Sequence, residues 1–502
     1  MTRLADFADL LDALAPDRRA ALIDAYARGL ESDGLTVYFA AEDRFAPIAP
    51  SLSPEIIDDA ELAALAADAE ALLSATAKAC VWTLTDPEGQ AAAATLYAGF
   101  TPLEHECLAR DPRRLFRVAT ARVDYFRGPD GHARALELNA TIPAMQGYSD
   151  LVQHRWLRLI AAELGRDPAP LLARAGSNTA DLLASLLEHH QQLGGRGAPP
   201  SILIVSRRGD SQTGELRHYE RAFAAAGHRA LHAYVDELGL DPEGRVTARG
   251  ETFDLLYRHI FARKVAPDSV LGRLLVDPGP NVILNPVLSP LEVKGVLGVL
   301  HADVASPASR LPLDERERDV VRRRVPWTRV LRAAPATIPD GGGDVPDLSL
   351  WAADNAARLV VKRSWDYGGK GVFIGPDGES DAARARMREL YGPECATWRE
   401  FVAHAARDPN VWVAQELVPP PLPRHLLVTR VTAGRPQGAW HEVFVDVNAY
   451  ACLGVAARPR GGVCRASSSK IVNIAGGGGV APLVTSSLAA ELLAAAGGGW
   501  SR

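Results

Sequence analysis

Two short stretches of the chain carry side chains that could hold a metal ion and phosphate together. The first contains Arg122 and Asp124, and the second contains Glu137 and Asn139. Two carboxylates and an amide supply the oxygen ligands that Mg²⁺ prefers, and substrate phosphates usually complete its coordination. Arg122 could offset the acids or bind phosphoryl oxygens. The alternative is a solvent-facing surface with an Arg–Glu pair, which would stabilise the fold by less than about 1 kcal/mol.

A β-hairpin over 117–138 would bring these stretches together. RVATARVDYF alternates like a strand, ARALEL follows as a second strand, and the tetrapeptide GPDG at 128–131 fits a type I turn between them. Residues two apart share one face of a strand. If the two glycines of the turn pair with each other, Arg122 lies opposite Glu137, with Asp124 beside it on the same face.

A glycine-rich segment, SWDYGGKG at 364–371, is a second candidate site. Glycines let the backbone approach a ligand closely, and successive N–H groups can hold phosphate. The segment is not a Walker loop, because Lys370 is followed by Gly371 and a strand replaces the expected helix. We expect a strand–loop–strand unit that folds over a nucleotide, with Lys362 reaching a phosphate. The alternative is an ordinary glycine-rich hairpin with solvent-exposed lysines.

Strands and helices alternate between residues 201 and 287, which predicts an α/β layer with parallel strands. No G-x-G-x-x-G motif is present there, so we expect no dinucleotide site. The helix expected over 213–226 could receive an anionic substrate group at its start near Thr213, and ordinary helix–sheet packing is the alternative. The expected strands are SILIVS (201–206), RALHAYV (229–235), FDLLYRHI (253–260) and NVILNPV (281–287).

Other elements are expected from periodicity and turn residues. The N-terminal segment predicts a helical hairpin over 3–33 and an alanine-rich helix over 59–80. Further expectations are helices over 150–190, a surface loop over 340–346, and a hairpin from RLVVKR (358–363) and GVFIG (371–375). A strand over 412–418, two strands of one antiparallel sheet (RHLLVTRVT and EVFVDVNAY), and a frayed tail, AAELLAAAGGGWSR, are also expected.

Composition indicates an ordinary globular chain without a nucleic-acid or membrane role. The 502 residues carry a net charge of −6, whereas a dedicated nucleic-acid-binding protein is more often basic. The five cysteines are scattered without a CxxC pair, which favours a reducing compartment and no zinc site. Among them, Cys107 follows His105 and Glu106, but we expect it to be structural. The acidic N-terminus does not look like a signal peptide, and no apolar run approaches a membrane span, so we expect a cytoplasmic protein.

Taken together, these segments resemble the ATP-grasp superfamily, in the circularly permuted order of glutathionylspermidine synthase-like proteins. In most ATP-grasp enzymes the Lys and glycine-loop half precedes the acid-x-Asn half, and here the order is reversed. The resemblance covers roughly 115–480. The matching motifs are Arg-x-Asp at 122–124, Glu-x-Asn at 137–139, Lys362 with Tyr-Gly-Gly-Lys-Gly at 367–371, Gln415-Glu416, and Arg465, Ser467 and Asn473 before Gly476–Gly479.

The segment between the two halves resembles the family as well. It contributes an early Glu215, a strand ending in Tyr257-Arg258, and an Asn-Pro stretch that leads to Lys294. One departure is Trp365, which stands near the place where a proline often follows the lysine.

The resemblance implies an α/β (α+β) fold, a circularly permuted ATP-grasp fold with an added α/β domain. The implied division is an N-terminal helical region (1–114), a segment carrying the Mg²⁺ hairpin (115–175), a pre-ATP-grasp-like α/β domain (176–310), a segment with the glycine loop and adenine hinge (311–490), and a flexible tail (491–502).

The resemblance also implies an ATP-dependent carboxylate–amine ligase that forms an amide through an acyl phosphate and releases ADP and phosphate. Its substrates would be a small-molecule or peptide carboxylate and an amine, and nothing in the sequence indicates the oligomeric state. Asp124, Glu137 and Asn139 would hold one or two Mg²⁺. Arg122 and Arg465 would stabilise the transferring phosphoryl group, although Arg465 could instead be a structural partner. ATP would be bound by Lys362, Tyr367, Gly368, Gly369, Lys370, Gly371, Gln415 and Glu416.

Three alternatives remain open on the sequence. The first is phosphoryl transfer from ATP to an acceptor that is not a carboxylate. The second is a protein that binds ATP without catalysis, although adenine binding alone does not need the three magnesium-ligand candidates. The third is an α/β protein with a structural role.

Overall fold

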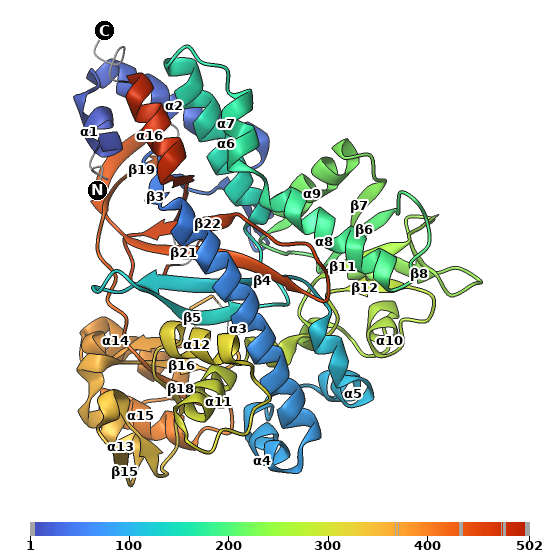
Figure 1. The fold of residues 1–502 in the computed structure, drawn as a ribbon, viewed down its shortest axis with the longest axis vertical. Helices are drawn as coiled ribbons and strands as arrows, with labels where there is room; N and C mark the ends of the chain where they lie inside the picture. Colours follow the sequence, from blue (N-terminus) through green and yellow to red (C-terminus); the bar gives the residue numbers. More distant parts are fainter. Residues whose placement is uncertain are drawn as a thin grey trace.

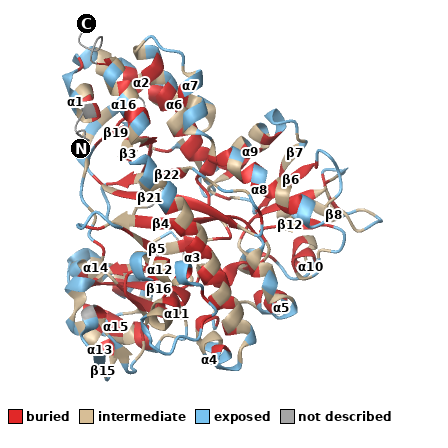
Figure 2. Cartoon of the chain, viewed as in Figure 1, coloured by how far each residue is buried: buried red, intermediate tan, exposed pale blue. Residues whose placement is uncertain are grey.

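The computed structural model describes residues 6–366, 368–369, 371–430, 435–472, 474 and 478–496. Tyr367, Lys370 and Asn473, which the resemblance singled out, lie outside these residues. The described elements gather around a central antiparallel sheet, with three groups of helices and strands arranged about it (Figure 1). Figure 2 shows buried residues concentrated in the sheet strands, while the exposed ones lie on outer helix faces and loops.

The central sheet joins two parts of the chain that are far apart in sequence. Its strand order is β23-β22-β21-β4-β5. Strands β4 (Val118–Arg127) and β5 (Ala133–Asn139) come from the first third of the chain, and β21 (Phe444–Leu453), β22 (Gly462–Ser467) and β23 (Gly479–Ala481) come from its end. The long helix α3 (Asp59–Thr85) crosses this sheet, and its apolar residues pack into a shared core (Figure 1).

A second antiparallel sheet carries the predicted glycine-loop hairpin. Its order is β13-β18-β16-β17, from Thr328–Val330, Trp412–Glu416, Leu359–Arg363 and Val372–Ile374. Helices α13 (Leu348–Asp354), α14 (Asp381–Tyr391) and α15 (Trp398–Arg407) accompany it. Trp412, Phe401 and Phe373 pack together in its core, with the rings of Phe401 and Trp412 5.3 Å apart. The antiparallel hairpin of β16 and β17 confirms the expected strand–loop–strand unit.

The third sheet is parallel, as the alternating pattern predicted. Its order is β12-β11-β6-β7, from Val282–Leu284, Leu255–His259, Ile202–Ser206 and Ala230–Tyr234. Helices α8 (Asn178–Gln192), α9 (Thr213–Ala225) and α10 (Val270–Val276) belong to this part of the fold. The continuous apolar run of β6 is buried throughout, which is typical of a parallel strand covered on both faces.

A helical group near both ends of the chain completes the arrangement (Figure 1). Helices α1 (Asp6–Ala13), α2 (Pro16–Asp33), α6 (Gln146–Glu163), α7 (Ala169–Ala175) and α16 (Ser486–Ala496) share a core that includes Tyr26 and Trp156. The two ends also pair as strands, because β3 (Glu55–Ile57) lies parallel to β24 (Leu483–Thr485).

The remaining elements are short. They are β1 (Thr36–Phe39), β2 (Arg44–Pro47), β8 (Leu238–Leu240), β9 (Val246–Ala248), β10 (Glu251–Thr252), β14 (Ala336–Thr337), β15 (Asp344–Val345), β19 (Arg424–Arg430), β20 (Pro436–Glu442), α4 (Pro87–Leu96), α5 (Pro102–Arg110), α11 (Lys294–Ala305) and α12 (Glu315–Arg324).

The register of the β4–β5 hairpin differs from the expected one. The turn closes with the Gly128 N–H donating to the His132 carbonyl at 2.8 Å, one residue later than expected, and a β-bulge leaves Leu136 unpaired. The two changes add up to a shift of two residues, and side chains alternate with period two, so the same side chains still share a face. In the observed register, Asp124 lies opposite Glu137 and Arg122 lies opposite Asn139.

Other expectations also need correction. The expected tail from 491 begins inside α16, which continues to Ala496 because Leu488 and Leu492 are buried against other helices. β19 pairs with β20, whereas β21 belongs to the central sheet, so the two expected strands do not share a sheet. The segment 1–114 contains β1, β2 and β3 as well as helices, and the expected loop over 340–346 contains β15. The proposed domain boundaries stay predictions.

Candidate functional site

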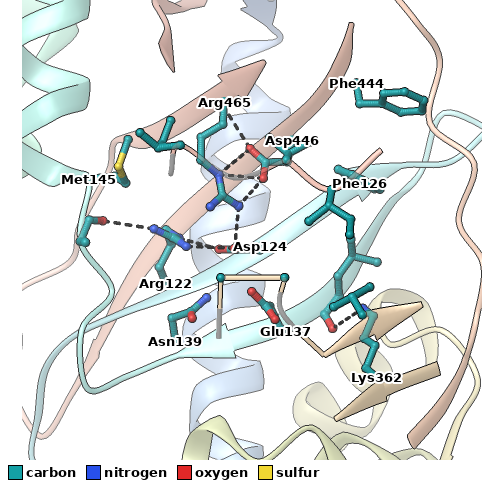
Figure 3. A pocket seen from close by; sticks show the side chains of 18 of the residues that line it. Arg122, Asp124, Phe126, Glu137, Asn139, Met145, Lys362, Phe444, Asp446 and Arg465 are labelled. Carbon is teal, nitrogen blue, oxygen red and sulfur yellow. Dashed lines mark hydrogen bonds and ion pairs between the residues drawn. The ribbon is translucent and has the colours of Figure 1, made fainter. Parts of the chain in front are cut away.

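A cavity of about 780 Å³ lies where the three sheets and the start of α6 meet. This volume is within the range of small-molecule sites, roughly 300–1,000 Å³. It gathers nearly all of the described candidate residues from both halves of the sequence, some of which Figure 3 shows around it. These are Arg122, Asp124, Glu137, Asn139, Lys362, Gly368, Gly369, Gln415, Glu416 and Arg465; Gly371 does not line the cavity.

Asp124 lies between two guanidinium groups. Arg122 Nε donates to its Oδ1 at 2.5 Å, and Arg465 Nη2 donates to its Oδ2 at 2.8 Å. Arg465 Nε also donates to Asp446 Oδ2 at 2.9 Å, so Arg465 bridges the two carboxylates (Figure 3). Burial would lower the pKa of Arg465, but Asp446 and Asp124 raise it, so the group stays charged. Burial raises the pKa of Asp446, and Arg465 opposes this change.

The sequence reasoning missed Asp446, although a signal was present. Asp446 and Asn448 are spaced like Glu137 and Asn139, on a segment already expected to be a strand. In the central sheet Asn448 pairs with Asp124. The Asn448 amide donates to Asp446 Oδ1 at 3.1 Å and accepts from the Tyr125 N–H at 3.1 Å. Asp446 therefore lines the cavity in a fixed position.

Glu137 carries the charge that offsets two buried lysines. Lys294 Nζ lies 3.2 Å from Glu137 Oε2, with the Lys294 side chain only 6% exposed. Burial alone would raise the pKa of Glu137, but Lys294 and Lys362 lower it to about 2. Burial lowers the pKa of Lys362 to about 8, and Glu137 limits that fall.

Lys362 and Gln415 connect the second sheet to the central sheet. Lys362 Nζ donates to Gln415 Oε1 at 2.6 Å across paired strands β16 and β18. Gln415 Nε2 donates to Thr328 Oγ1 at 3.1 Å and to the Leu136 carbonyl at 3.4 Å. The Leu136 carbonyl belongs to the bulge of β5, so these contacts fix the position of the lysine relative to Glu137. Glu416 lines the same cavity.

The glycine loop comes close to the C-terminal segment of the chain. Gly368 and Gly369 have φ values of +67° and +71°, which favour glycine. A Cβ on Gly369 would lie 2.4 Å from Ile471 Cγ2. Lys294 Nζ donates to the Asp366 carbonyl at 2.8 Å, so the lysine beside Glu137 also binds the start of the loop.

Trp365, which precedes the glycine loop, packs between two arginines. The Arg263 and Arg363 guanidinium carbons lie 4.8 and 5.3 Å from its rings. Arg263 follows β11 of the parallel sheet, so the contact joins the glycine-loop hairpin to another part of the fold.

The side chains of Asn285 and Glu292 hold the ends of the β4–β5 hairpin. Asn285 Oδ1 accepts from the Ala119 N–H at 2.7 Å, and its Nδ2 donates to the Thr120 and Ala140 carbonyls at 3.0 and 2.8 Å. Glu292 accepts from the N–H groups of Ala140 and Thr141 at 3.0 and 2.7 Å. These bonds position the residues next to Arg122 and Asn139.

Other residues singled out by sequence have structural contacts. Glu215 is fully buried and accepts from the N–H groups of Met145 and Gly147 at 3.0 and 2.9 Å, which fixes the start of α6. Arg258 is also fully buried and donates to the Asn285 carbonyl at 2.9 Å. Burial raises the pKa of the Cys107 thiol to about 11, which leaves it protonated and supports the structural expectation for that residue.

The candidate magnesium ligands form an open set of oxygens. Asp124, Glu137 and Asn139 line one cavity, but no group of three His, Cys, Asp or Glu side chains at metal-binding distance occurs among the described residues. Each carboxylate binds a cationic side chain, and Asn139 Nδ2 is buried without a hydrogen-bond partner. This donor set fits Mg²⁺ carried by a nucleotide, because Mg²⁺ is usually held by one or two carboxylates and substrate phosphates.

Comparisons with known proteins indicate the fold. No protein-family model matches the chain. It is 25% identical over 309 residues to a putative glutamate–cysteine ligase 2-3 of Frankia alni, a match that covers 61% of this chain and 32% of that protein. The chain thus spans about a third of the length of this curated relative.

Among solved structures, a glutathione synthetase-like effector of Globodera pallida in its apo form superposes with a TM-score of 0.55 at 12% identity. The match covers 94% of this chain and 98% of that one, so the two share a mixed α/β fold over nearly their whole length. In the described part of this chain, the helices are too short or too polar to span a membrane.

Proposed function

We propose that this protein is an ATP-dependent ligase that joins a carboxylate to an amine through an acyl phosphate, on a circularly permuted ATP-grasp fold. One observation carries the proposal. A single cavity combines a lysine and glycine loop from one hairpin with acidic and amide side chains from another hairpin, which lies far earlier in the sequence. Phosphoryl transfer relies mainly on such positioning and charge neutralisation.

The strand pairing supports the permuted arrangement. β4 and β5 carry the Arg-x-Asp and Glu-x-Asn motifs, and β4 pairs with β21 near the other end of the chain. The sheet is therefore continuous although the sequence that forms it is not. The names of the ligase relative and of the glutathione synthetase-like structure support a ligase kind of activity.

In this proposal, Lys362, Lys294 and the N–H groups of Gly368 and Gly369 bind the phosphates of ATP. The segment after β18, including Glu416, would bind adenine. One or two Mg²⁺ would be held by Asp124, Glu137 and Asn139, together with Asp446. Bound Mg²⁺ would neutralise phosphate charge. Arg122 and Arg465 would orient and stabilise the transferring phosphoryl group, and carboxylate attack on that group would release ADP.

Calorimetric titration with ATP, with and without Mg²⁺, tests the nucleotide site without knowledge of the other substrates. We expect the wild-type protein to bind ATP in a Mg²⁺-dependent manner and the folded variant Glu137→Ala/Asn139→Ala to lose that dependence. Glu243→Ala, an exposed acid outside the cavity, serves as the control and should behave like the wild type. A folded wild-type protein that binds no ATP with Mg²⁺ present would overturn the proposal.

A second experiment separates the ligase from its alternatives. ADP and phosphate release would be measured with pairs of carboxylates and amines, beginning with glutamate and cysteine. A ligase gives ADP, free phosphate and an amide. Phosphate retained on the acceptor would indicate a phosphotransferase, and bound ATP that is never converted to ADP would indicate a non-catalytic binding protein.

A further inference from the structure

The cavity continues beyond the phosphate-binding residues to a second end with its own chemistry. This end is lined by the loop 207–212 that follows β6, the segment 260–264 that follows β11, and the β1–β2 hairpin. β6 and β11 are adjacent parallel strands, with Ser206 paired to His259 at their carboxyl ends. β7 lies on the other side of β6, so the strand order reverses between β6 and β11. In open α/β sheets, ligands bind outside the carboxyl ends of the strands at such a point.

Charges of both signs meet at this end. Asp210 lines the cavity with its side chain only 9% exposed, and Arg207 Nε lies 3.9 Å from Asp210 Oδ2. Lys264 also lines the cavity and is exposed, and its ammonium group makes no ion pair or hydrogen bond with any described residue. Two cations and one acid are therefore available to a ligand that itself carries both charges.

Apolar side chains form the adjoining wall. Val37 and Ile48 come from the N-terminal hairpin, and Ile142 and Met145 come from the segment before α6. The Tyr38 N–H donates to the Ser211 carbonyl at 2.9 Å, which holds β1 next to the charged loop. The Tyr148 hydroxyl of α6 donates to the Thr36 carbonyl at 2.5 Å, which holds β1 next to the start of α6.

We propose that this end of the cavity binds an α-amino acid with an apolar side chain, as the amine substrate of the ligase proposed above. Arg207 and Lys264 bind the α-carboxylate, Asp210 binds the α-ammonium group, and Val37 and Ile48 cover the side chain. As the acceptor, the ammonium group loses one proton to solvent, its nitrogen forms a bond to the acyl carbon, and the carbon–oxygen bond to phosphate breaks. The nitrogen then loses a second proton, which the released phosphate takes up, and the amide remains. The inference rests on the proposed function for its catalytic consequence, but the binding itself can be measured separately.

The test uses L-leucine and three analogues that each lack or change one feature. They are L-leucinamide, without the carboxylate; 4-methylpentanoate, without the ammonium group; and L-glutamate, with a charged side chain. Each is titrated against the full-length protein, with and without Mg²⁺ and a non-hydrolysable ATP analogue. We expect leucine to bind about tenfold more tightly than leucinamide and 4-methylpentanoate, which is a typical value for one charge-assisted contact. Leucine should also bind more tightly than glutamate, whose charged side chain would lie against the apolar wall. When a carboxylate substrate identified by the ADP-release assay above is also present, leucine should stimulate ADP release from Mg²⁺–ATP.

Variants assign each contact. Arg207→Ala should weaken leucine binding about tenfold and reduce the preference over leucinamide, because only Lys264 then binds the carboxylate, with ATP affinity unchanged. In the wild type, the Gln212 N–H donates to Asp210 Oδ1 at 2.9 Å, and Asp210→Asn keeps an oxygen that can accept this bond. This variant should remove only the preference over 4-methylpentanoate. Arg208→Ala is the matched control, because Arg208 lies next in sequence but pairs with Asp236 at 2.7 Å, outside the cavity.

The outcomes distinguish this inference from the proposed function. If Mg²⁺–ATP binds but leucine binds no better than its analogues, the amino-acid site is wrong and the ligase proposal stands. If leucine binds with the expected preferences while ATP does not bind, the ligase proposal fails and the amino-acid site stands. Equal effects of Arg207→Ala and Arg208→Ala would also overturn the assignment.

Discussion

Lys362 is a residue whose charge depends directly on its surroundings in the cavity. Burial lowers its pKa to about 8, and its ammonium group contacts Gln415. Because the charged form binds phosphate, the free protein has its full positive charge at this position only below pH 8.

The first prediction therefore concerns pH. We expect ATP affinity, measured calorimetrically between pH 7 and 9.5, to fall as the pH rises through about 8, by up to about tenfold per pH unit. The variant Lys362→Arg stays charged across this range and should show a nearly flat profile. The same decline in Lys362→Arg would show that another group titrates.

The Glu137 carboxylate offsets part of the positive charge in the cavity. Its carboxylate, with a pKa near 2, is ionised at neutral pH, and two buried lysines lower that pKa. Glu137→Gln removes that charge while keeping the shape of the side chain. We expect the free energy of unfolding at pH 7 to fall, because the buried lysines lose a compensating charge. The loss should be only about 1–2 kcal/mol, because the Glu137 side chain is partly exposed.

The same variant should lower the pH midpoint of ATP binding below that of the wild type, because Lys362 loses the negative charge that most raises its pKa. Urea denaturation and calorimetry measure the two effects. Glu61→Gln is the control, since Glu61 pairs with the partly exposed Arg127 at 2.9 Å outside the cavity. It should change stability by less than about 1 kcal/mol and leave the pH profile unchanged. A Glu137→Gln profile identical to that of the wild type would contradict this account.

At the scale of elements, the glycine loop depends on its backbone conformation. Gly369→Ala places a Cβ 2.4 Å from Ile471 at a φ of +71°, so the loop or its neighbour must move. We expect ATP affinity to fall about tenfold, the equivalent of about 1.4 kcal/mol. Gly131→Ala has a similar φ of +78° but no atom within 4 Å, and it should cost about 1 kcal/mol of stability without changing ATP binding. Equal effects of the two variants on ATP affinity would refute the role of the loop.

The position of the β4–β5 hairpin depends on hydrogen bonds from the Asn285 side chain. Asn285→Ala leaves three buried backbone groups without partners and should lower the free energy of unfolding by about 2–4 kcal/mol. Asn281 offers a matched control, because it accepts from the Val246 N–H at 2.7 Å and donates to the Gly244 and Pro278 carbonyls. Urea denaturation should show both variants to be destabilised, and only Asn285→Ala should weaken Mg²⁺-dependent ATP binding. Unchanged ATP binding in folded Asn285→Ala would show that the hydrogen bonds from Asn285 to the hairpin do not position the site.

At the scale of the whole molecule, the site exists only where separate parts of the chain meet. Hydrogen exchange should therefore show that Mg²⁺–ATP protects three distant segments together: 118–139, 359–372 and 444–467. At a nucleotide concentration about 100 times the dissociation constant, the stabilisation is about 2.7 kcal/mol and the melting temperature rises by about 2–3 °C. Lys362→Met should lose both effects. Protection confined to 359–372 would mean that the hairpins do not act as one site.

Much of the local structure could be predicted from the sequence, because it follows from short-range patterns. The parallel strands appear as apolar runs between helices, and the glycine-loop hairpin follows from two apolar runs around a glycine-rich turn. The same patterns could not show that β19 and β21 belong to different sheets, since alternation gives a strand its two faces but not its partner.

For the candidate site, the sequence determined which chemical groups are present and that Glu137 shares a strand face with Asn139. It did not determine the contacts that control their charge. Arg465 reaches Asp124 only because β22, β21 and β4 are neighbours in one sheet, and Lys294 reaches Glu137 from the start of α11. The pKa values near 2 and 8 follow from burial and from these long-range contacts, so only the tertiary structure decided them.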